Sequence, residues 1–115
     1  MDDVRLRAMF ATIDAVDWDA LPQFFHAEIV YERPGFPPLC GLDRVLRFYH
    51  NERKIVRSTH HVEGTVVQDD LGAVWGRVGC VLTNGTETEL GFADIYHFDR
   101  NLVRLRRTHF FVPGV

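Results

Sequence analysis

Acidic side chains alternate with large apolar residues in stretches that are typical of β-strands. Glu32 follows Val30 at a spacing of two, and Asp94 stands between Phe92 and Tyr96 at the same spacing. Side chains two apart in a strand share a face, so we expect both carboxylates among apolar neighbours. A buried charge must be neutral, paired or at a cavity wall. In a dry cavity a carboxylate's pKa rises, and the group can move protons near neutral pH.

Three basic side chains follow the same alternation. It places His60 on the core side of its strand, in the set His60, Val62, Gly64 and Val66. In the last strand the more apolar set is Val103, Leu105, Arg107, His109 and Phe111, which leaves Arg104 and Arg106 on the solvated face. A carboxylate base, a histidine that transfers protons and an arginine that stabilises an enolate together suggest general acid–base chemistry.

Each of these residues also has a purely structural interpretation. Asp94 can pair with Arg107 on the neighbouring strand, and Glu32 can be a solvated residue at a strand end. His60 and His109 can be structural histidines whose hydrogen bonds are satisfied. The sequence leaves these alternatives open.

Other kinds of chemistry have no recognisable motif here. His60 and His61 are adjacent in a strand and face opposite ways, which argues against a metal site. The sequence has no nucleophile elbow and no phosphate-binding glycine loop. We therefore expect no metal and no cofactor.

Composition indicates one ordinary globular domain over residues 1–115, with 46% hydrophobic residues and a formal net charge of −3. The negative net charge argues against nucleic-acid binding. No run reaches the ~18 apolar residues of a membrane span, and the start lacks the apolar core of a signal peptide. We expect a cytoplasmic location.

The first half predicts helices and one short strand. Asp2 or Asp3 caps a helix that runs to about Ala15, and a short helix capped by Asp19 has Pro22 in its first turn. A strand over residues 28–33, a rim loop over 34–41 and a third helix over 42–53 follow.

The second half, residues 58–112, predicts an antiparallel meander of four long strands. Asn84-Gly85 between two β-rich runs indicates a hairpin with a type I′ turn. Helices gathered at one end and strands at the other give an α+β fold. We expect a curved sheet whose concave face is covered by the N-terminal helices, with an apolar pocket between them.

This arrangement resembles the NTF2-like (cystatin-like) superfamily, a cone-shaped α+β fold, and its SnoaL-like and ketosteroid-isomerase-like branch. The resemblance covers residues 6–111. Its markers are Asp17-Trp18-Asp19-Ala20-Leu21, Val30-Tyr31-Glu32-Arg33-Pro34-Gly35 with Gly41, Thr59-His60-His61-Val62-Glu63, and Gly91-Phe92-Ala93-Asp94-Ile95-Tyr96-His97-Phe98.

The resemblance implies roles for particular residues. Glu32 falls where ketosteroid isomerases keep their aspartate base, and Tyr96 falls where they keep an oxyanion donor. Asp14 and His60 occupy positions similar to an aspartate and a histidine of scytalone dehydratase. Asp94 lies about where SnoaL-type polyketide cyclases carry an acid–base aspartate.

These observations predict a cofactor-independent isomerase, aldol-type cyclase or dehydratase that acts on an apolar carbonyl compound, such as a polyketide or steroid-like molecule. Trp18, Phe36 and Phe92 would hold the apolar body of the substrate, with Arg107 and His109 beside them. A non-catalytic ligand-binding module and a partner-docking domain are the alternatives. A homodimer is expected from the resemblance, through the outer sheet face that holds Trp75, Arg77 and Val81.

Overall fold

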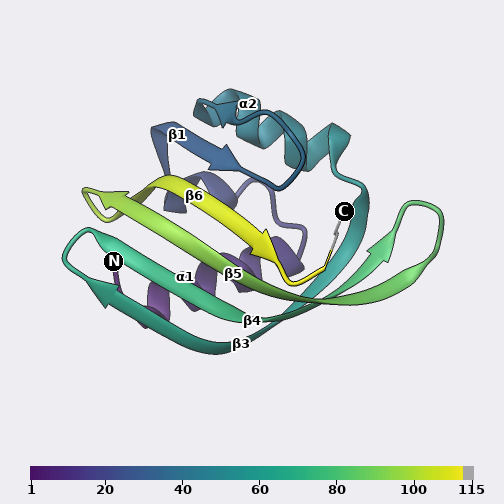
Figure 1. Cartoon of the computed structure of the whole chain (residues 1–115). Coiled ribbons are helices and arrows are strands. Elements are labelled where there is room, and N and C mark those ends of the chain that lie inside the picture. The colour runs from purple at the N-terminus through teal and green to yellow at the C-terminus, as the bar shows by residue number, and fades with distance from the viewer. Residues whose placement is uncertain (113–115) are drawn as a thin grey trace.

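The computed structural model describes residues 1–112 and consists of one curved sheet with helices on its concave side (Figure 1). The elements in chain order are α1 (Asp3–Asp14), η1 (Leu21–Phe24), β1 (Phe25–Glu32), β2 (Leu39–Cys40), α2 (Leu42–Arg47), η2 (Phe48–Glu52), β3 (Ile55–Gln68), β4 (Leu71–Leu82), β5 (Glu87–Asp99) and β6 (Leu102–Phe110). The sheet has six strands in the order β2-β1-β6-β5-β4-β3. The β1–β6 pair is parallel and the other pairs are antiparallel.

Helix α1 begins as predicted and covers the sheet with one apolar face. The Asp2 carboxylate accepts a hydrogen bond from the backbone N–H of Arg5 at 2.8 Å, which caps the helix. The buried face consists of Leu6, Met9, Phe10 and Ile13. Val16 follows the helix in a left-handed conformation, with φ of 58°, and the chain turns away there.

The two shorter helical segments differ in detail from the prediction. Segment η1 is a four-residue 3₁₀-helix with Pro22 in its first turn, but Ala20 rather than Asp19 occupies the N-cap. The third helix begins at Leu42 as expected, and its last part, η2, is a π-helix. Both Phe48 and Tyr49 in η2 are buried.

The predicted meander is present as strands β3 to β6. A hairpin does form at Asn84-Gly85, but the type I′ expectation is wrong, because Gly85 alone is left-handed there, with φ of 84°. Leu82 accepts from the Gly85 N–H at 2.9 Å, which makes a longer loop in which glycine takes the left-handed position. Arg100 and Asn101, between β5 and β6, both have positive φ, the pattern of a type I′ turn.

Face alternation holds for His60 but changes further along β3. His60 and Val62 face the concave side, as predicted, and His61 is exposed. A register shift between Val62 and Gly64 then reverses the faces, so Val66 is 54% exposed instead of sharing the inner face. An extra residue in one strand produces such a reversal.

A second register shift overturns the predicted faces of β6. His97 pairs with Leu105, but Phe98 pairs with Val103, so β6 carries one extra residue at this point. As a result Arg106 and Thr108 are buried, although Arg106 was expected in solvent. Arg107 and His109, which we expected on the apolar face, are exposed.

The prediction of which side chains of β1 face inward is also wrong. Ile29 and Tyr31 are 1% and 8% exposed and form the buried face, so Val30 and Glu32 lie on the other side. Glu32 pairs with Arg107 of β6, its parallel neighbour, and both side chains are partly in solvent.

The outer face of the sheet holds some apolar residues in solvent. Trp75 and Ile95 are each 41% exposed, and the Trp75 ring lies over Gly64, where a Cβ atom would come within 2.2 Å of it. Arg77 is exposed and Val81 is partly exposed on the same side of β4. The homodimer stays a prediction. In residues 1–112, no helix is both long enough and apolar enough to cross a membrane.

Candidate functional site

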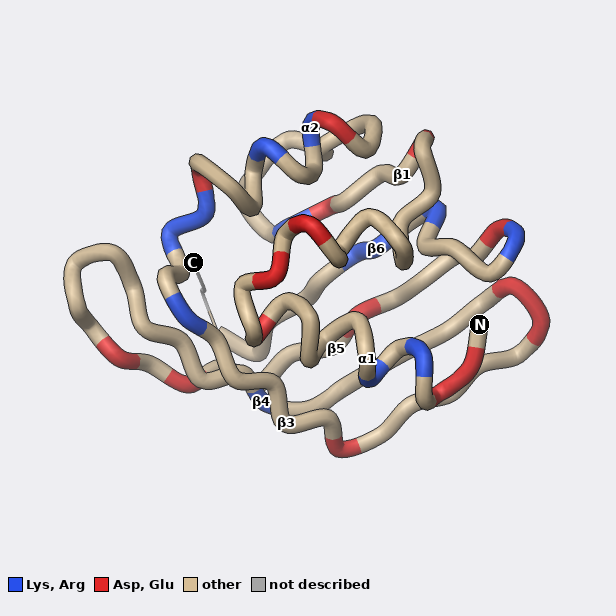
Figure 2. The backbone as a smooth tube through the Cα atoms, turned by 180° about the vertical axis from the view of Figure 1, so that it is seen from behind, with Lys and Arg blue, Asp and Glu red and all other residues tan. Residues whose placement is uncertain are grey.

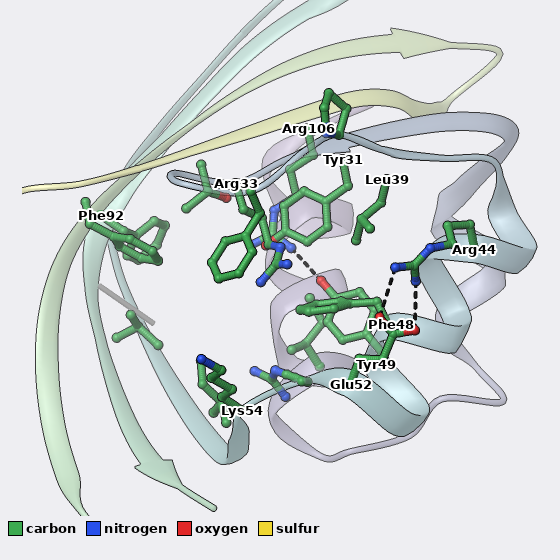
Figure 3. A pocket seen from close by; sticks show the side chains of 18 of the residues that line it. Tyr31, Arg33, Leu39, Arg44, Phe48, Tyr49, Glu52, Lys54, Phe92 and Arg106 are labelled. Carbon is green, nitrogen blue, oxygen red and sulfur yellow. Dashed lines mark hydrogen bonds and ion pairs between the residues drawn. The ribbon is translucent and has the colours of Figure 1, made fainter. Parts of the chain in front are cut away.

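A cavity of about 430 Å³ lies between the helices and the concave face of the sheet (Figure 3). Its deep wall contains buried apolar side chains, among them Ile13, Val78 and Phe92. Its mouth, which we define as its exposed lining residues, consists of Phe36, Pro37, Pro38, Glu52 and Lys54. The predicted apolar pocket and its rim loop are therefore both present.

The Asp14 carboxylate, at the end of α1, contacts the His60 ring on β3. Its Oδ1 atom lies 2.6 Å from Nδ1 of His60, and its Oδ2 accepts from the backbone N–H of His60 at 2.8 Å. The Ser58 hydroxyl donates to Asp14 Oδ1 at 2.8 Å, and Nη2 of Arg53 donates to that hydroxyl at 3.0 Å. Helix α1 and strand β3 are thus joined by a set of directional contacts at one point.

These contacts determine the tautomer of His60. Burial alone would raise the pKa of Asp14, but hydrogen bonds from His60 and Ser58 outweigh it, so the pKa lies below its ordinary value. An ionised carboxylate only accepts hydrogen bonds, so Nδ1 of His60 carries the hydrogen. The other ring nitrogen, Nε2, faces away from Asp14 on a ring that lines the cavity.

Aromatic side chains hold the His60 ring in place. Its centroid lies 4.7 Å from that of Phe10 and 5.5 Å from that of Phe92, the latter edge to face. The side chain is only 8% exposed. An imidazole nitrogen that keeps its lone pair at this position could accept a proton from a bound molecule.

Tyr49 supplies a hydrogen-bond donor to the same cavity. Its oxygen accepts a hydrogen bond from Nη1 of Arg106 at 2.8 Å, so its own O–H hydrogen remains available (Figure 3). Burial raises the pKa of Tyr49 well above its ordinary value, although the charge of Arg106 opposes this. Tyr49 is therefore a neutral donor beside a fixed positive charge.

Asp94 lies behind this wall of the cavity with both of its oxygens occupied. It accepts from Arg106 Nε at 3.0 Å, from the Tyr96 hydroxyl at 2.7 Å and from Thr108 at 2.7 Å. Burial by itself would lower the pKa of Arg106. The negative charge of Asp94 outweighs this effect and holds the pKa of Arg106 well above its usual range. The structural interpretation of Asp94 as an ion pair therefore holds, with Arg106 as the partner in place of Arg107.

The structure brings together some of the predicted site residues. His60, Phe36 and Phe92 line the cavity, Asp14 contacts His60 from behind, and the Trp18 ring lies 5.1 Å from that of Tyr49. The remaining predicted residues are outside the lining. Asp94 and Tyr96 are buried behind Arg106, whereas Glu32, Arg107 and His109 lie away from the cavity.

Sequence reasoning missed several residues that line the cavity. They are Tyr31, Arg33, Arg44, Tyr49, Glu52, Arg53, Lys54 and Arg106. The apolar Ile29/Tyr31 alternation could have identified Tyr31 and Arg33, and the third-helix spacing already marked Tyr49. No local signal marks Arg106, because its orientation depends on the bulge in β6.

A metal site has no basis among the described residues. His60 and His61 face opposite ways, as expected, and residues 1–112 contain no group of three or more His, Cys, Asp or Glu side chains that could hold a metal ion.

Comparison with known proteins identifies the architecture. A family model described as the SnoaL-like domain matches residues 6–105. A comparison with curated proteins gives no match.

Solved structures with the same fold include proteins of different description. An NTF2-like protein of unknown function from Burkholderia pseudomallei is 16% identical, with a TM-score of 0.82 over 91% of this chain and 86% of that one. An LEH-like epoxide hydrolase from M. tuberculosis is 14% identical, with a TM-score of 0.80 over 91% and 78%. The epoxide hydrolase/cyclase-like enzyme SalBIII, described in pyran ring formation of the polyether salinomycin, is 15% identical, with a TM-score of 0.80 over 96% and 94%. At such identities the likeness establishes the fold, which is the predicted NTF2-like cone.

Proposed function

The chain belongs to the SnoaL-like domain family, and we propose that it is an enzyme that transfers protons on a small carbonyl compound. His60 is the general base and acid, and Asp14 orients it. Tyr49 stabilises the negative oxygen that forms. Glu32 and Asp94, the carboxylates first considered as bases, take no part in the proton transfer.

The proposal rests on one observation, the 2.6 Å contact between Asp14 Oδ1 and His60 Nδ1 at the wall of a cavity. A carboxylate bonded to Nδ1 fixes the ring, leaves the lone pair on Nε2 and stabilises the imidazolium that forms when Nε2 takes a proton. The Phe10 and Phe92 rings beside His60 give this part of the wall a low polarity, which strengthens electrostatic interactions there.

The reaction begins with removal of a proton from the carbon next to a carbonyl group. Nε2 of His60 takes the proton, the C–H electron pair forms the enolate double bond, and the carbonyl oxygen becomes negative. The Tyr49 O–H donates to that oxygen, and Arg106 behind it supports the charge. A positioned base of this type contributes about 10²–10⁴-fold to the rate.

The protonated His60 then determines the outcome. Returning the proton to a different carbon gives an isomer, and giving it to a departing hydroxyl gives water and an alkene. Attack of the enolate on a second carbonyl, with the proton going to the new alkoxide, gives an aldol-type ring. The same residues serve all three reactions.

Exchange of a carbon-bound hydrogen tests the first step without knowledge of the natural substrate. In D₂O, proton NMR follows the loss of the C1 hydrogens of 2-tetralone, a cyclic ketone that fits an apolar cavity. We expect catalysed exchange by the wild-type protein, a reduction of about 10²-fold or more in His60→Gln, and no change in His61→Gln. His61 is the matched control because it is exposed on the opposite face. Equal exchange by the wild type and His60→Gln would refute the proposed base.

A non-catalytic ligand-binding module is the second candidate, and a specific observation favours it. Both carboxylates that were considered as bases are ion-paired, Glu32 with Arg107 and Asp94 with Arg106. This candidate predicts that 2-tetralone protects the protein against thermal unfolding while exchange stays at the rate of the buffer.

A further inference from the structure

The cavity wall has an excess of positive charge, although the whole chain has a formal net charge of −3. Five cationic side chains line the cavity, together with one acidic side chain, that of Glu52. The cations are Arg33, Arg44, Arg53, Lys54 and Arg106. Some of them come from the segment between η2 and β3, where basic residues gather in Figure 2. An apolar neutral ligand alone does not account for such a lining.

Two of the five cations are neutralised by neighbouring carboxylates. Arg44 donates to both Glu52 oxygens, at 3.0 and 2.9 Å. Arg106 is paired with Asp94 at 3.0 Å. These two pairs explain the presence of Arg44 and Arg106 without any ligand, and they also use the one acidic residue of the lining.

The other three cations have no acidic partner among residues 1–112. The Nε of Arg33 and the Nη1 of Arg53 are buried atoms that make no hydrogen bond within this part of the chain. Lys54 is exposed at the mouth and forms no ion pair with the described residues. The three side chains therefore carry positive charge that no carboxylate among the described residues balances, and an anion in the cavity would balance it.

Arg33 is held in a fixed position for such a group. Its guanidinium lies 4.5 Å from the ring centroid of Phe36 and 4.0 Å from that of Phe48. Burial lowers the pKa of Arg33 even though Tyr31 and Tyr49 oppose this, so an anion beside the guanidinium would stabilise its charge. Figure 3 shows Arg33 and Lys54 directed toward the same space from different segments. A planar guanidinium fork matches the two oxygens of a carboxylate.

Depth in the cavity sets the orientation of the bound molecule. Lys54 is exposed and Arg33 and Arg53 are half-buried, so the cations lie toward the mouth. Phe92 and Val78 are 2% and 4% exposed and lie deep, near His60. A molecule that uses both regions has its charged group outward and its apolar body against His60.

We infer that the ligand of this cavity is a small organic carboxylate with an apolar body, bound through Arg33, Arg53 and Lys54. The inference rests on the proposed function in taking the cavity as the substrate site, and it adds the substrate class. The carboxylate anchors the molecule, and the carbonyl group that reacts lies on its inner, apolar part.

Calorimetric titration with a matched pair of probes tests this assignment. The pair is 2-naphthoate and its neutral analogue 2-naphthamide, which have the same ring system. We expect 2-naphthoate to bind about tenfold more tightly or better, since only the anion has the negative charge and the second acceptor oxygen that match the cationic side chains. Raising the salt from about 50 to 500 mM should weaken the binding of the anion and leave the amide unaffected. Equal affinities, or no binding of either probe, would overturn the inference, and tighter binding of 2-naphthyl phosphate would replace the carboxylate by a phosphate ester.

Three variants identify the residues responsible. Arg33→Gln and Lys54→Gln should each reduce the preference for the anion about fivefold or more, whereas Arg57→Gln should leave it unchanged. Arg57 is exposed and lies outside the cavity lining, so its replacement removes one positive charge without altering the cavity. Lys54 is exposed, so its variant remains informative if Arg33→Gln folds poorly by circular dichroism. An equal loss in Arg57→Gln would overturn the assignment.

These experiments test the proposed function and the proposed substrate class separately. His60→Gln should lose the exchange of 2-tetralone and keep the preference for 2-naphthoate. Loss of that preference in His60→Gln would overturn the anchoring role of the three cations. Exchange without any preference for the anion would leave the proposed function in place and remove only the substrate class.

Discussion

Replacing Asp14 by asparagine removes the charge that orients His60 while it keeps the size of the side chain. The carboxylate accepts three hydrogen bonds, from the Ser58 hydroxyl, the His60 backbone N–H and the His60 ring. Asparagine has one oxygen, which in the place of Oδ2 still accepts from the His60 backbone N–H. Its amide nitrogen then takes the place of Oδ1, where it donates and cannot accept the Nδ1 hydrogen. The His60 ring then prefers the tautomer that has its hydrogen on Nε2. In that tautomer Nε2 has no free lone pair with which to accept a proton from the substrate.

The expected size of the effect follows from the bond that is lost. A hydrogen bond to a charged group contributes about 1.5–3 kcal/mol. Because about 1.4 kcal/mol corresponds to a factor of ten, the population of the tautomer that acts as base should decrease about 10- to 150-fold. The free energy of unfolding should decrease by a similar amount, about 1–3 kcal/mol, because the Asp14 side chain is 22% exposed and the bond is largely shielded from water.

The rate of exchange of the C1 hydrogens of 2-tetralone reports the loss of the tautomer that acts as base. Urea unfolding measures the change in the free energy of unfolding. Asp19→Asn is the matched control, because Asp19 is an exposed aspartate outside the cavity lining. We expect wild-type exchange and stability in the control. Exchange by Asp14→Asn within twofold of wild type would refute the reasoning, because the orientation of His60 would then not depend on Asp14.

Three further predictions follow from the same network. Arg106→Gln leaves Asp94 buried without its ion-pair partner and should destabilise the fold by about 3–5 kcal/mol, whereas Arg107→Gln, on the exposed side, should leave the urea midpoint unchanged; equal effects would contradict the bulge in β6. Tyr49→Phe should slow the exchange of 2-tetralone about 10²- to 10³-fold with little change in ketone affinity, because the donor acts on the charge that forms during reaction; an unchanged rate would exclude Tyr49 as that donor. The pKa of Asp14 is lower in the folded protein than its unfolded value of about 3.9, so the stabilisation is complete above the unfolded pKa and is lost as the pH falls through the folded pKa. Urea unfolding in this acid range should therefore show a steeper loss of stability for the wild type than for Asp14→Asn, and parallel curves would contradict the lowered pKa.

The fold could be predicted from local patterns because it depends on periodicity. The apolar spacing of Leu6, Phe10 and Ile13 identified α1, and the alternating runs around Asn84-Gly85 identified the hairpin. Both signals extend over many residues, so a small local deviation does not change the element that they indicate. The family match over residues 6–105 agrees with this architecture.

Strand faces were less predictable, because one extra residue reverses every side chain after it. Alternation placed His60 correctly, since His60 and Val62 lie between the two register shifts in β3. It placed Arg107 inside and Arg106 outside, since the shift in β6 comes before them. A bulge is set by pairing between strands, and a single strand's pattern does not record that pairing.

The proton-transfer pair was only partly accessible from sequence. Asp14 and His60 are 46 positions apart in the chain, and the resemblance to scytalone dehydratase pointed to both. Residue patterns placed Glu32 with Val30 on the inner face of its strand, although the other face, with Ile29 and Tyr31, is fully apolar and is the buried one. Apolar content identifies the buried face of a strand more reliably than the presence of one interesting polar group.

The tautomer of His60 tests the central claim most directly. Long-range ¹H–¹⁵N NMR on the ring nitrogens of the neutral histidine, assigned with His60→Gln, distinguishes a hydrogen on Nδ1 from one on Nε2. The geometry predicts the hydrogen on Nδ1 in the wild type and a shift toward Nε2 in Asp14→Asn. A wild-type ring with its hydrogen on Nε2 would contradict the account, because no lone pair would then face the cavity to accept a proton.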